Sequence, residues 1–312
     1  MSVICMGILM KRRFCGLAIL LVFSCPFGCV HSSKTELERG VQGVTYIGGA
    51  GAGGADANIT SRTVNYSPAA GHAIIASAYT CYDSNCFAPP TTTMAISDNK
   101  NSPETCFAAS PHSPFALNET SMGKQQLQEY IWVCPSIPSG VTSFTITCSV
   151  AKSCSFMTLT VTDWTGLAAS NVFDVDGGAA STVRQTTATI PTSSPTRFTN
   201  ELLYTFLDNT GDETMSAVSP YAAVLQFWPG NINTAALIAS PGPQTAQTTW
   251  TRADDWYGAI VAIKSASSVL ATGSASSSQR SLTNSRLFGL FPPDGDVVAY
   301  DAARIIRGRE DD

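Results

Sequence analysis

The sequence predicts an all-β fold, an antiparallel two-sheet sandwich or jelly roll with cysteine-clamped loops. Three observations support this prediction. Many short segments alternate apolar and polar residues, as strands with one buried face do. Residues that favour turns, chiefly glycine, proline, serine, threonine and asparagine, separate these segments at short intervals. No amphipathic helix pattern lies between them, which argues against an α/β fold.

The clearest strands lie between residues 129 and 167. Residues 143–148 alternate apolar residues with serine and threonine, and residues 156–162 repeat this pattern. The sequence therefore predicts that these two segments pair as an antiparallel hairpin. Residues 130–134 are a third strand, and the prolines and glycine that follow it mark a turn.

Further strands are predicted on both sides of this stretch. They span residues 41–47, 58–66, 71–81, 93–97, 105–109, 200–206, 222–228, 235–239 and 255–264. Residues 48–55 contain a formal G-x-G-x-x-G, but a strand-like segment follows it where a dinucleotide site needs a helix. A flexible glycine loop is predicted there, and a turn-rich crossover is predicted for residues 171–197.

The amino terminus predicts export. The basic cluster Lys11–Arg13 precedes an apolar run at residues 14–23, which is too short for a comfortable membrane span. Residues 1–29 are therefore predicted to be a signal peptide, and the polar residues 30–40 a tether to the first strand.

The signal peptide allows two outcomes. Cleavage after Ser24 would leave Cys25 at the new amino terminus, and the sequence before it is similar to a bacterial lipoprotein signal. Phe23 is bulkier than the residue usual at its position. Lipidation of Cys25, which would anchor the chain to the outer membrane, and plain secretion both remain open.

The strands between residues 41 and 266 are predicted to form one domain. A Ser/Ala-rich linker follows at residues 267–285, and residues 286–312 form a C-terminal tail. The formal charge is −5, and losing the three basic residues of the leader makes the mature chain more acidic. This balance excludes the basic face that a nucleic-acid partner requires.

Six of the ten cysteines follow the leader region. They are Cys81, Cys86, Cys106, Cys134, Cys148 and Cys154. An even number in an oxidising compartment predicts disulfides. Proximity favours pairing 81 with 86 and 148 with 154, which leaves 106 with 134. A metal site is the alternative, but no C-x-x-C pair or histidine partner accompanies these cysteines.

The order of the strands resembles that of lectin-like β-sandwich domains, of the concanavalin or jelly-roll type, in secreted bacterial proteins. The segments that carry the resemblance are residues 71–81, the turn at Asp98-Asn99, residues 131–133, 163–167, 200–203 and 259–263. The resemblance covers about residues 41–266 and implies a sandwich fold. It implies no catalytic residues.

Two acidic loops, residues 174–178 and 208–213, gather oxygen donors around glycine, as calcium sites do. Asp208, Asp212 and Glu213 are the predicted ligands, and calcium is the one cofactor that the sequence suggests. Ordinary turn formation is the alternative, because aspartate, asparagine and glycine all favour turns.

Trp228 and Trp250 are the candidate ligand-binding aromatics, because they lie near predicted strand ends and offer flat faces for stacking on sugars. Glycoside hydrolysis requires a pair of carboxylates, and four glutamates are candidates, but the sequence does not show which two would act together. The candidates are Glu104, Glu119, Glu129 and Glu201. His72 and His112 lie in no recognisable zinc or nucleophile motif.

We expect an exported or surface-anchored, non-catalytic binding module. Its partner would be a glycan or another cell-envelope component, and it would contact a membrane only through a lipid anchor. Two alternatives remain, a secreted glycan-active hydrolase and a structural envelope protein. Fold alone does not decide between them.

Overall fold

The computed structural model describes most of the chain from Gly43 to Ala271, within one compact unit. The described residues are 43–54, 59–81, 93–100, 106–119, 125–149, 154–181, 183–211, 213–228 and 230–271. The predicted signal peptide, Cys25, the tether and the C-terminal tail lie outside them. The prediction of an all-β fold of antiparallel sheets is confirmed. The described part of the chain contains no helix that could span a membrane.

Four sheets take the place of the two predicted. Inner sheet 1 contains β1 (Thr45–Ala52), β9 (Ser155–Thr165), β3 (Ala73–Cys81), β7 (Gln125–Cys134) and β5 (Ala108–Ala109) in this order, with β6 (Phe115–Glu119) also paired to β7. Outer sheet 1 contains β2 (Ser61–Asn65), β8 (Ser143–Cys148) and β4 (Met94–Asp98). Inner sheet 2 contains β10 (Phe173–Ala180), β17 (Trp256–Lys264), β12 (Glu201–Asn209), β15 (Asn231–Ile238) and β14 (Ala222–Trp228). Outer sheet 2 contains β11 (Gln185–Pro191), β16 (Thr245–Asp254) and β13 (Ser216–Ala217).

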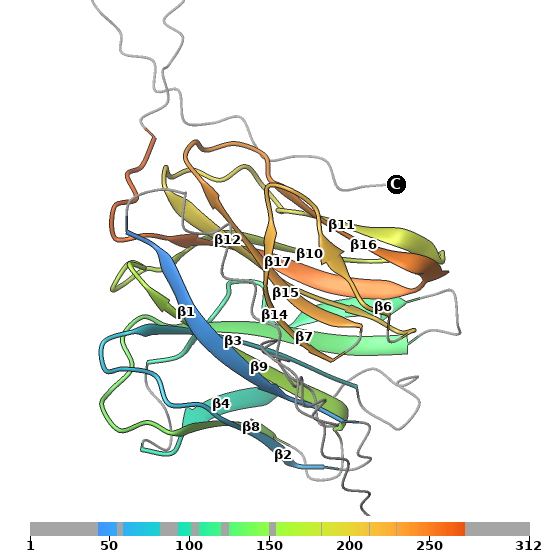
Figure 1. Ribbon diagram of the computed structural model, residues 1–312, viewed down its shortest axis with the longest axis horizontal. Coiled ribbons are helices and arrows are strands. Elements are labelled where there is room, and N and C mark those ends of the chain that lie inside the picture. The colour runs from blue at the N-terminus through green and yellow to red at the C-terminus, as the bar shows by residue number, and fades with distance from the viewer. Residues whose placement is uncertain are drawn as a thin grey trace, which may run out of the picture. The chain divides into compact units, whose positions relative to one another are not determined.

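The sheets stack in four layers, from outer sheet 1 at the bottom of Figure 1 to outer sheet 2 at the top. A hydrophobic core fills each of the three spaces. The central core lies between the two inner sheets and includes Ile75 and Phe206. Inner strands are therefore apolar on both faces. In β3, Ile74 faces the outer core while its neighbour Ile75 faces the central core, which explains the nearly continuous apolar sequence of this strand.

The two halves of the chain repeat one topology. In chain order, β1 to β9 visit the inner and outer sheet 1 in the same sequence as β10 to β17 visit the inner and outer sheet 2, except that β5 and β6 share the place of β14. Both first strands carry Gly-Gly-Ala, at residues 48–50 and 177–179, and both have a register shift shortly before it. The chain is thus two sandwiches joined face to face through their inner sheets.

The predicted hairpin of residues 143–148 and 156–162 is wrong, although both strands exist. β8 pairs with β2 and β4 in outer sheet 1, whereas β9 pairs with β1 and β3 in inner sheet 1. Their apolar faces meet across the outer core, where Phe144 and Ile146 pack in one cluster with Leu159. Alternation identifies strands with one buried face, but it does not say whether two of them lie side by side or face to face.

The glycine segment is a strand and not a flexible loop. β1 continues through Ala52, and its glycines let other groups approach the backbone closely. A Cβ at Gly49 would lie 2.6 Å from the carbonyl oxygen of Val161, and a Cβ at Gly51 would lie 2.5 Å from the ring of Phe227. The glycines therefore serve packing against β9 and β14.

The predicted crossover at residues 171–197 is also wrong, because β10 and β11 occupy most of it. In β11, Ala188 and Ile190 are buried on either side of the exposed Thr189, so the alternation is present but short. At the other boundary, the chain remains attached to the domain beyond residue 266. Leu270 forms a bridge with Phe198.

Two of the three predicted disulfides are confirmed, Cys106–Cys134 and Cys148–Cys154. The second joins the end of β8 to the residue before β9, and so links an outer sheet to an inner one. Cys86 lies outside the described residues, so its pairing with Cys81 stays a prediction.

Candidate functional site

Trp228 is the exposed aromatic residue of the described chain. It ends β14, and 51% of its surface is accessible to solvent. Leu225 pairs with Asn233 and Trp228 with Asn231, so β14 holds one more residue than its partner between these pairs. Such a bulge changes the direction of the side chains that follow it, which explains why the indole faces outward at the end of a sheet.

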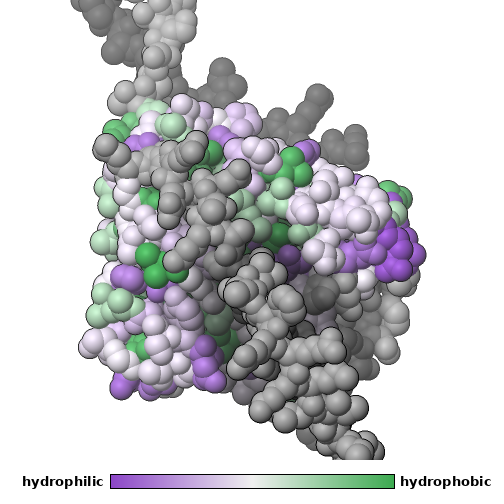
Figure 2. Space-filling model, in the orientation of Figure 1, coloured by the Kyte–Doolittle hydropathy of each residue, from purple (hydrophilic) through white to green (hydrophobic). Residues whose placement is uncertain are grey.

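The neighbouring surface belongs to β1. Strands β1 and β14 are the edge strands of the two inner sheets and contact each other. Phe227 packs its ring against Gly51 of β1 and Gly53 just beyond it, which have no side chains of their own. Figure 2 shows hydrophobic residues on the described part of this face as separate small patches among polar ones. Trp228 therefore lies beside an edge strand of low relief.

Trp250, the other predicted platform, is in the wrong place for that role. It lies within β16, is 6% exposed and packs in the core between inner sheet 2 and outer sheet 2. No strand is predicted for residues 245–254, so the sequence does not indicate that Trp250 is one of the alternate residues buried in β16. Trp132 of β7 is buried in the core between inner sheet 1 and outer sheet 1.

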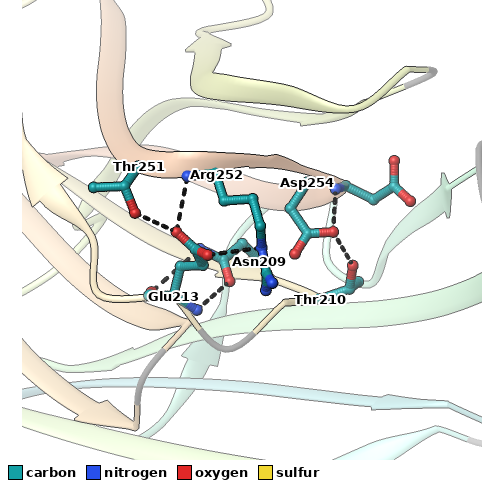
Figure 3. Close-up of polar contacts among 7 residues, drawn as sticks. Asn209, Thr210, Glu213, Thr251, Arg252 and Asp254 are labelled. Atoms are coloured by element: carbon teal, nitrogen blue, oxygen red, sulfur yellow. Dashed lines mark hydrogen bonds and ion pairs between the residues drawn. The ribbon is translucent and has the colours of Figure 1, made fainter.

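Glu213, a predicted calcium ligand, is held by an arginine. Its Oε2 accepts hydrogen bonds from the Thr251 hydroxyl at 2.6 Å and the Arg252 amide at 2.9 Å, and its Oε1 lies 2.9 Å from Arg252 Nε (Figure 3). The bond from Thr251 is the largest cause of a lowered pKa for this carboxyl. Asn209 also bonds the backbone of Glu213 on both sides, at 3.0 and 3.3 Å.

This network fixes the turn between β12 and β13 against the end of β16. Thr210 donates to Asp254 Oδ1 at 3.1 Å, and a Cβ at Gly211 would collide with the other oxygen of that carboxylate. The polar side chains of this turn are thus hydrogen-bonded within the turn and to the end of β16 (Figure 3). Asp212 lies outside the described residues, and the calcium site of the sequence stays a prediction.

Asp208, the third predicted ligand, faces a different way. β12 continues to Asn209, so Asp208 shares the inward face of Tyr204 and Phe206 and points between the inner sheets. Its carboxylate accepts a hydrogen bond from Asn231 Nδ2 at 3.3 Å and another from the hydroxyl of Tyr257. The sequence predicts a strand that ends at residue 206, and this places Asp208 in a loop.

Glu129 lies opposite Asp208, on β7 of inner sheet 1. Its side chain is fully buried, and burial is the largest cause of a pKa raised well above the ordinary glutamate value. The charge of Asp208 raises it further, and the backbone amide of Ala259 acts in the opposite direction. In the sequence, nothing distinguishes Glu129 from the other three candidate glutamates, because its partner Asp208 is 79 residues away.

A second buried carboxyl lies at the opposite end of β12. Burial, followed by the charge of Asp174, raises the pKa of Glu201 to about 8. Asp174 itself accepts hydrogen bonds at 2.6 Å from both the backbone amide and the Nε of Arg197. Lys264, which pairs with Glu201 across the sheet, places its ammonium over the ring of Phe198. With its pKa raised to about 8, Glu201 is mostly protonated at neutral pH.

Each histidine of the described chain bonds a buried aspartate. His72 Nδ1 lies 2.8 Å from Asp163 Oδ1, and His112 bonds Asp176 through both its ring and its backbone amide. Nothing in the sequence signals these pairs, because 91 and 64 residues separate their members. Within the described residues neither ring bonds a serine or cysteine side chain.

A pocket of about 430 Å³ lies at the opposite end of the molecule from Trp228. It is lined by Cys106, Ala108, Pro135, Ser170, Asn171, Val172 and Phe173, none of which is charged. The described part of the chain contains no group of three or more histidine, cysteine or acidic side chains placed to hold a metal. Comparison with known proteins finds no matching family model, no similar curated protein and no similar solved structure.

Proposed function

We propose that the chain is an exported, non-catalytic binding module whose ligand is a glycan or another cell-envelope component. The observation that carries the proposal is the half-exposed indole of Trp228, aimed outward by the bulge at the end of β14. The resemblance of the sequence to secreted lectin-like β-sandwich domains agrees with this role. The two disulfides support export, because such bonds persist in oxidising compartments.

The chemistry of the platform fits sugars. An indole ring offers a broad flat apolar face and a single polar edge, so it stacks on the C–H face of a pyranose while its N–H meets water or a hydroxyl. Gly51 and Gly53 add no side-chain bulk at the neighbouring end of β1, where the ring of Phe227 packs. We expect a saccharide longer than one ring to extend from Trp228 toward this end of β1.

A glycan array followed by calorimetry with the best hit tests the proposal. We expect Trp228→Ala to abolish detectable binding and Trp228→Phe to retain part of it, because the smaller ring still stacks. Leu270→Ala is the matched control, since Leu270 is equally exposed but lies at the opposite end of inner sheet 2. Retention of full affinity by Trp228→Ala would place the ligand elsewhere.

The hydrolase alternative has weaker support. Glycoside hydrolysis needs two carboxyl groups that reach the scissile bond from a cleft. Glu129 and Asp208 do face one another, but Glu129 is completely buried between the inner sheets. A sugar ring cannot approach it in this structure. Absence of reducing-sugar release from array-positive glycans would agree with a binding role.

A further inference from the structure

A cluster of polar side chains lies between the two inner sheets, at one end of the central core. Glu129 and Tyr79 pair across β7 and β3 of inner sheet 1, and Asp208 pairs with both Tyr257 and Asn231 in inner sheet 2. The rings of Tyr79 and Tyr257 pack edge to face, with their centroids 5.5 Å apart. These five residues therefore form one cluster that joins the two halves of the repeat.

Three oxygen atoms of this cluster accept no hydrogen bond of standard length and angle, and the backbone amide of Ala259 makes only a weaker contact with Glu129. They are both carboxyl oxygens of Glu129 and the side-chain oxygen of Asn231. Glu129 is 0% exposed and Asn231 is 1% exposed, so water does not cover them from the surface. The hydroxyl of Tyr257 is already bonded to Asp208 and Tyr79. Buried oxygens are nearly always partnered, so three together need an explanation.

A shared proton does not supply one. Protonation of Glu129 adds a single donor, which can bond Asn231 Oδ1 or Asp208 but leaves at least one of the three oxygens without a partner. A divalent cation can be coordinated by all three oxygens and by the Asp208 carboxylate. Its two positive charges balance the two negative charges of the carboxylates. Because the site is buried between the sheets, an unbalanced charge there costs more free energy than it does at the surface.

We propose that Glu129, Asp208 and Asn231 hold one divalent cation of the oxygen-binding class, best matched by Ca²⁺, between the two inner sheets. Ca²⁺ prefers carboxylate and amide oxygens in irregular arrangements and tolerates additional water ligands. Asp208 and Tyr79 are only partly buried, which gives the ion a route from the rim. The ion would fasten one sandwich to the other.

This site differs from the calcium loop that the sequence suggested. Asp208 belongs to both, but Glu213 is committed to Thr251 and Arg252, on the other side of the β12 backbone. The two sites can therefore be separated by mutation. Asn231 also pairs directly with Trp228, so the ion would lie one residue pair from the proposed platform without depending on it.

Calcium titration of metal-free protein by calorimetry, with terbium luminescence in parallel, tests the proposal. Phenol rings transfer excitation to a nearby Tb³⁺, so Tyr79 and Tyr257 would report an ion at this position. We expect saturable luminescence that Ca²⁺ displaces, with a Kd on the order of 10⁻⁴ to 10⁻³ M as in extracellular modules. The midpoint of thermal unfolding should rise with added Ca²⁺.

Glu129→Gln keeps the shape of the side chain and removes its charge, and should weaken Ca²⁺ binding by roughly tenfold or more. Asn231→Ala gives an independent loss if Glu129→Gln does not fold, as judged by circular dichroism. Glu213→Gln is the control and should bind Ca²⁺ as the unaltered chain does. The proposal is overturned if Ca²⁺ changes neither luminescence nor the unfolding midpoint, or if Glu129→Gln and Asn231→Ala retain the full effect.

Discussion

Cys148, the last residue of β8, is bonded to Cys154 just before β9, and this bond fastens an outer sheet to an inner one. The loop that it closes is short, with a sequence separation of 6. The bond between Cys106 and Cys134 joins residues with a sequence separation of 28, and Cys134 is the last residue of β7 in inner sheet 1. The two bonds therefore constrain the unfolded chain to different extents.

We expect loss of the longer bond to cost more stability. Loop-closure entropy gives about 3.6 kcal/mol for a separation of 28 and about 2.2 kcal/mol for a separation of 6. Urea unfolding of the paired alanine variants of Cys106 and Cys134, and of Cys148 and Cys154, measures both values. A larger loss for the second pair would show that the tie between layers matters more than chain entropy.

The packing of β1 against β14 yields a second prediction. Gly51→Ala should destabilise the protein by about 1–3 kcal/mol, because its Cβ would lie 2.5 Å from the ring of Phe227. Phe227→Ala should then cost less in the Gly51→Ala background than alone, since the added methyl group fills part of the space that the ring leaves. Additive losses in this double-mutant cycle would contradict the contact.

The third prediction concerns pH. The pKa of Glu201 is raised to about 8 in the folded chain, well above its ordinary value of 4.5, so the folded state retains a proton that the unfolded state releases. The stability that this proton provides is complete below about pH 4.5 and is lost as the pH rises through about 8. The urea midpoint should therefore fall across this interval.

Glu201→Gln should flatten that decline, because the amide mimics the neutral acid at every pH. Glu129 also has a raised pKa and should leave a residual slope, so metal-free buffer and comparison at equal ionic strength are needed. Equal slopes for the unaltered chain and Glu201→Gln would mean that Glu201 is ionised in the folded state.

How far the sequence leads is clearest in the strands themselves. Ser143–Cys148 and Ala222–Trp228 are predicted to the residue, because alternation and turn residues are local signals. The partners of a strand are not local. β8 could lie beside β9 or face it with the same alternation, and only long-range packing selects the second arrangement.

The repeat is hidden for a similar reason. Equivalent strands such as β3, AIIASAYTC, and β12, ELLYTFLDN, share apolar character but no residue when aligned. Disulfide pairing was predictable from proximity, because short separations restrict the choice. The pairing of Glu129 with Asp208 was not, since it depends on two sheets meeting face to face.

The two tryptophans provide the last prediction, because the structure separates residues that the sequence treated alike. Trp250→Ala should destabilise the chain by about 3–5 kcal/mol, since its ring fills the core between inner sheet 2 and outer sheet 2. Trp228→Ala should change stability by no more than about 0.5 kcal/mol, because half of its surface already meets water. Urea unfolding of both variants measures the difference. Comparable losses would mean that Trp228 supports the fold, and its role as a ligand platform would then lose its main structural argument.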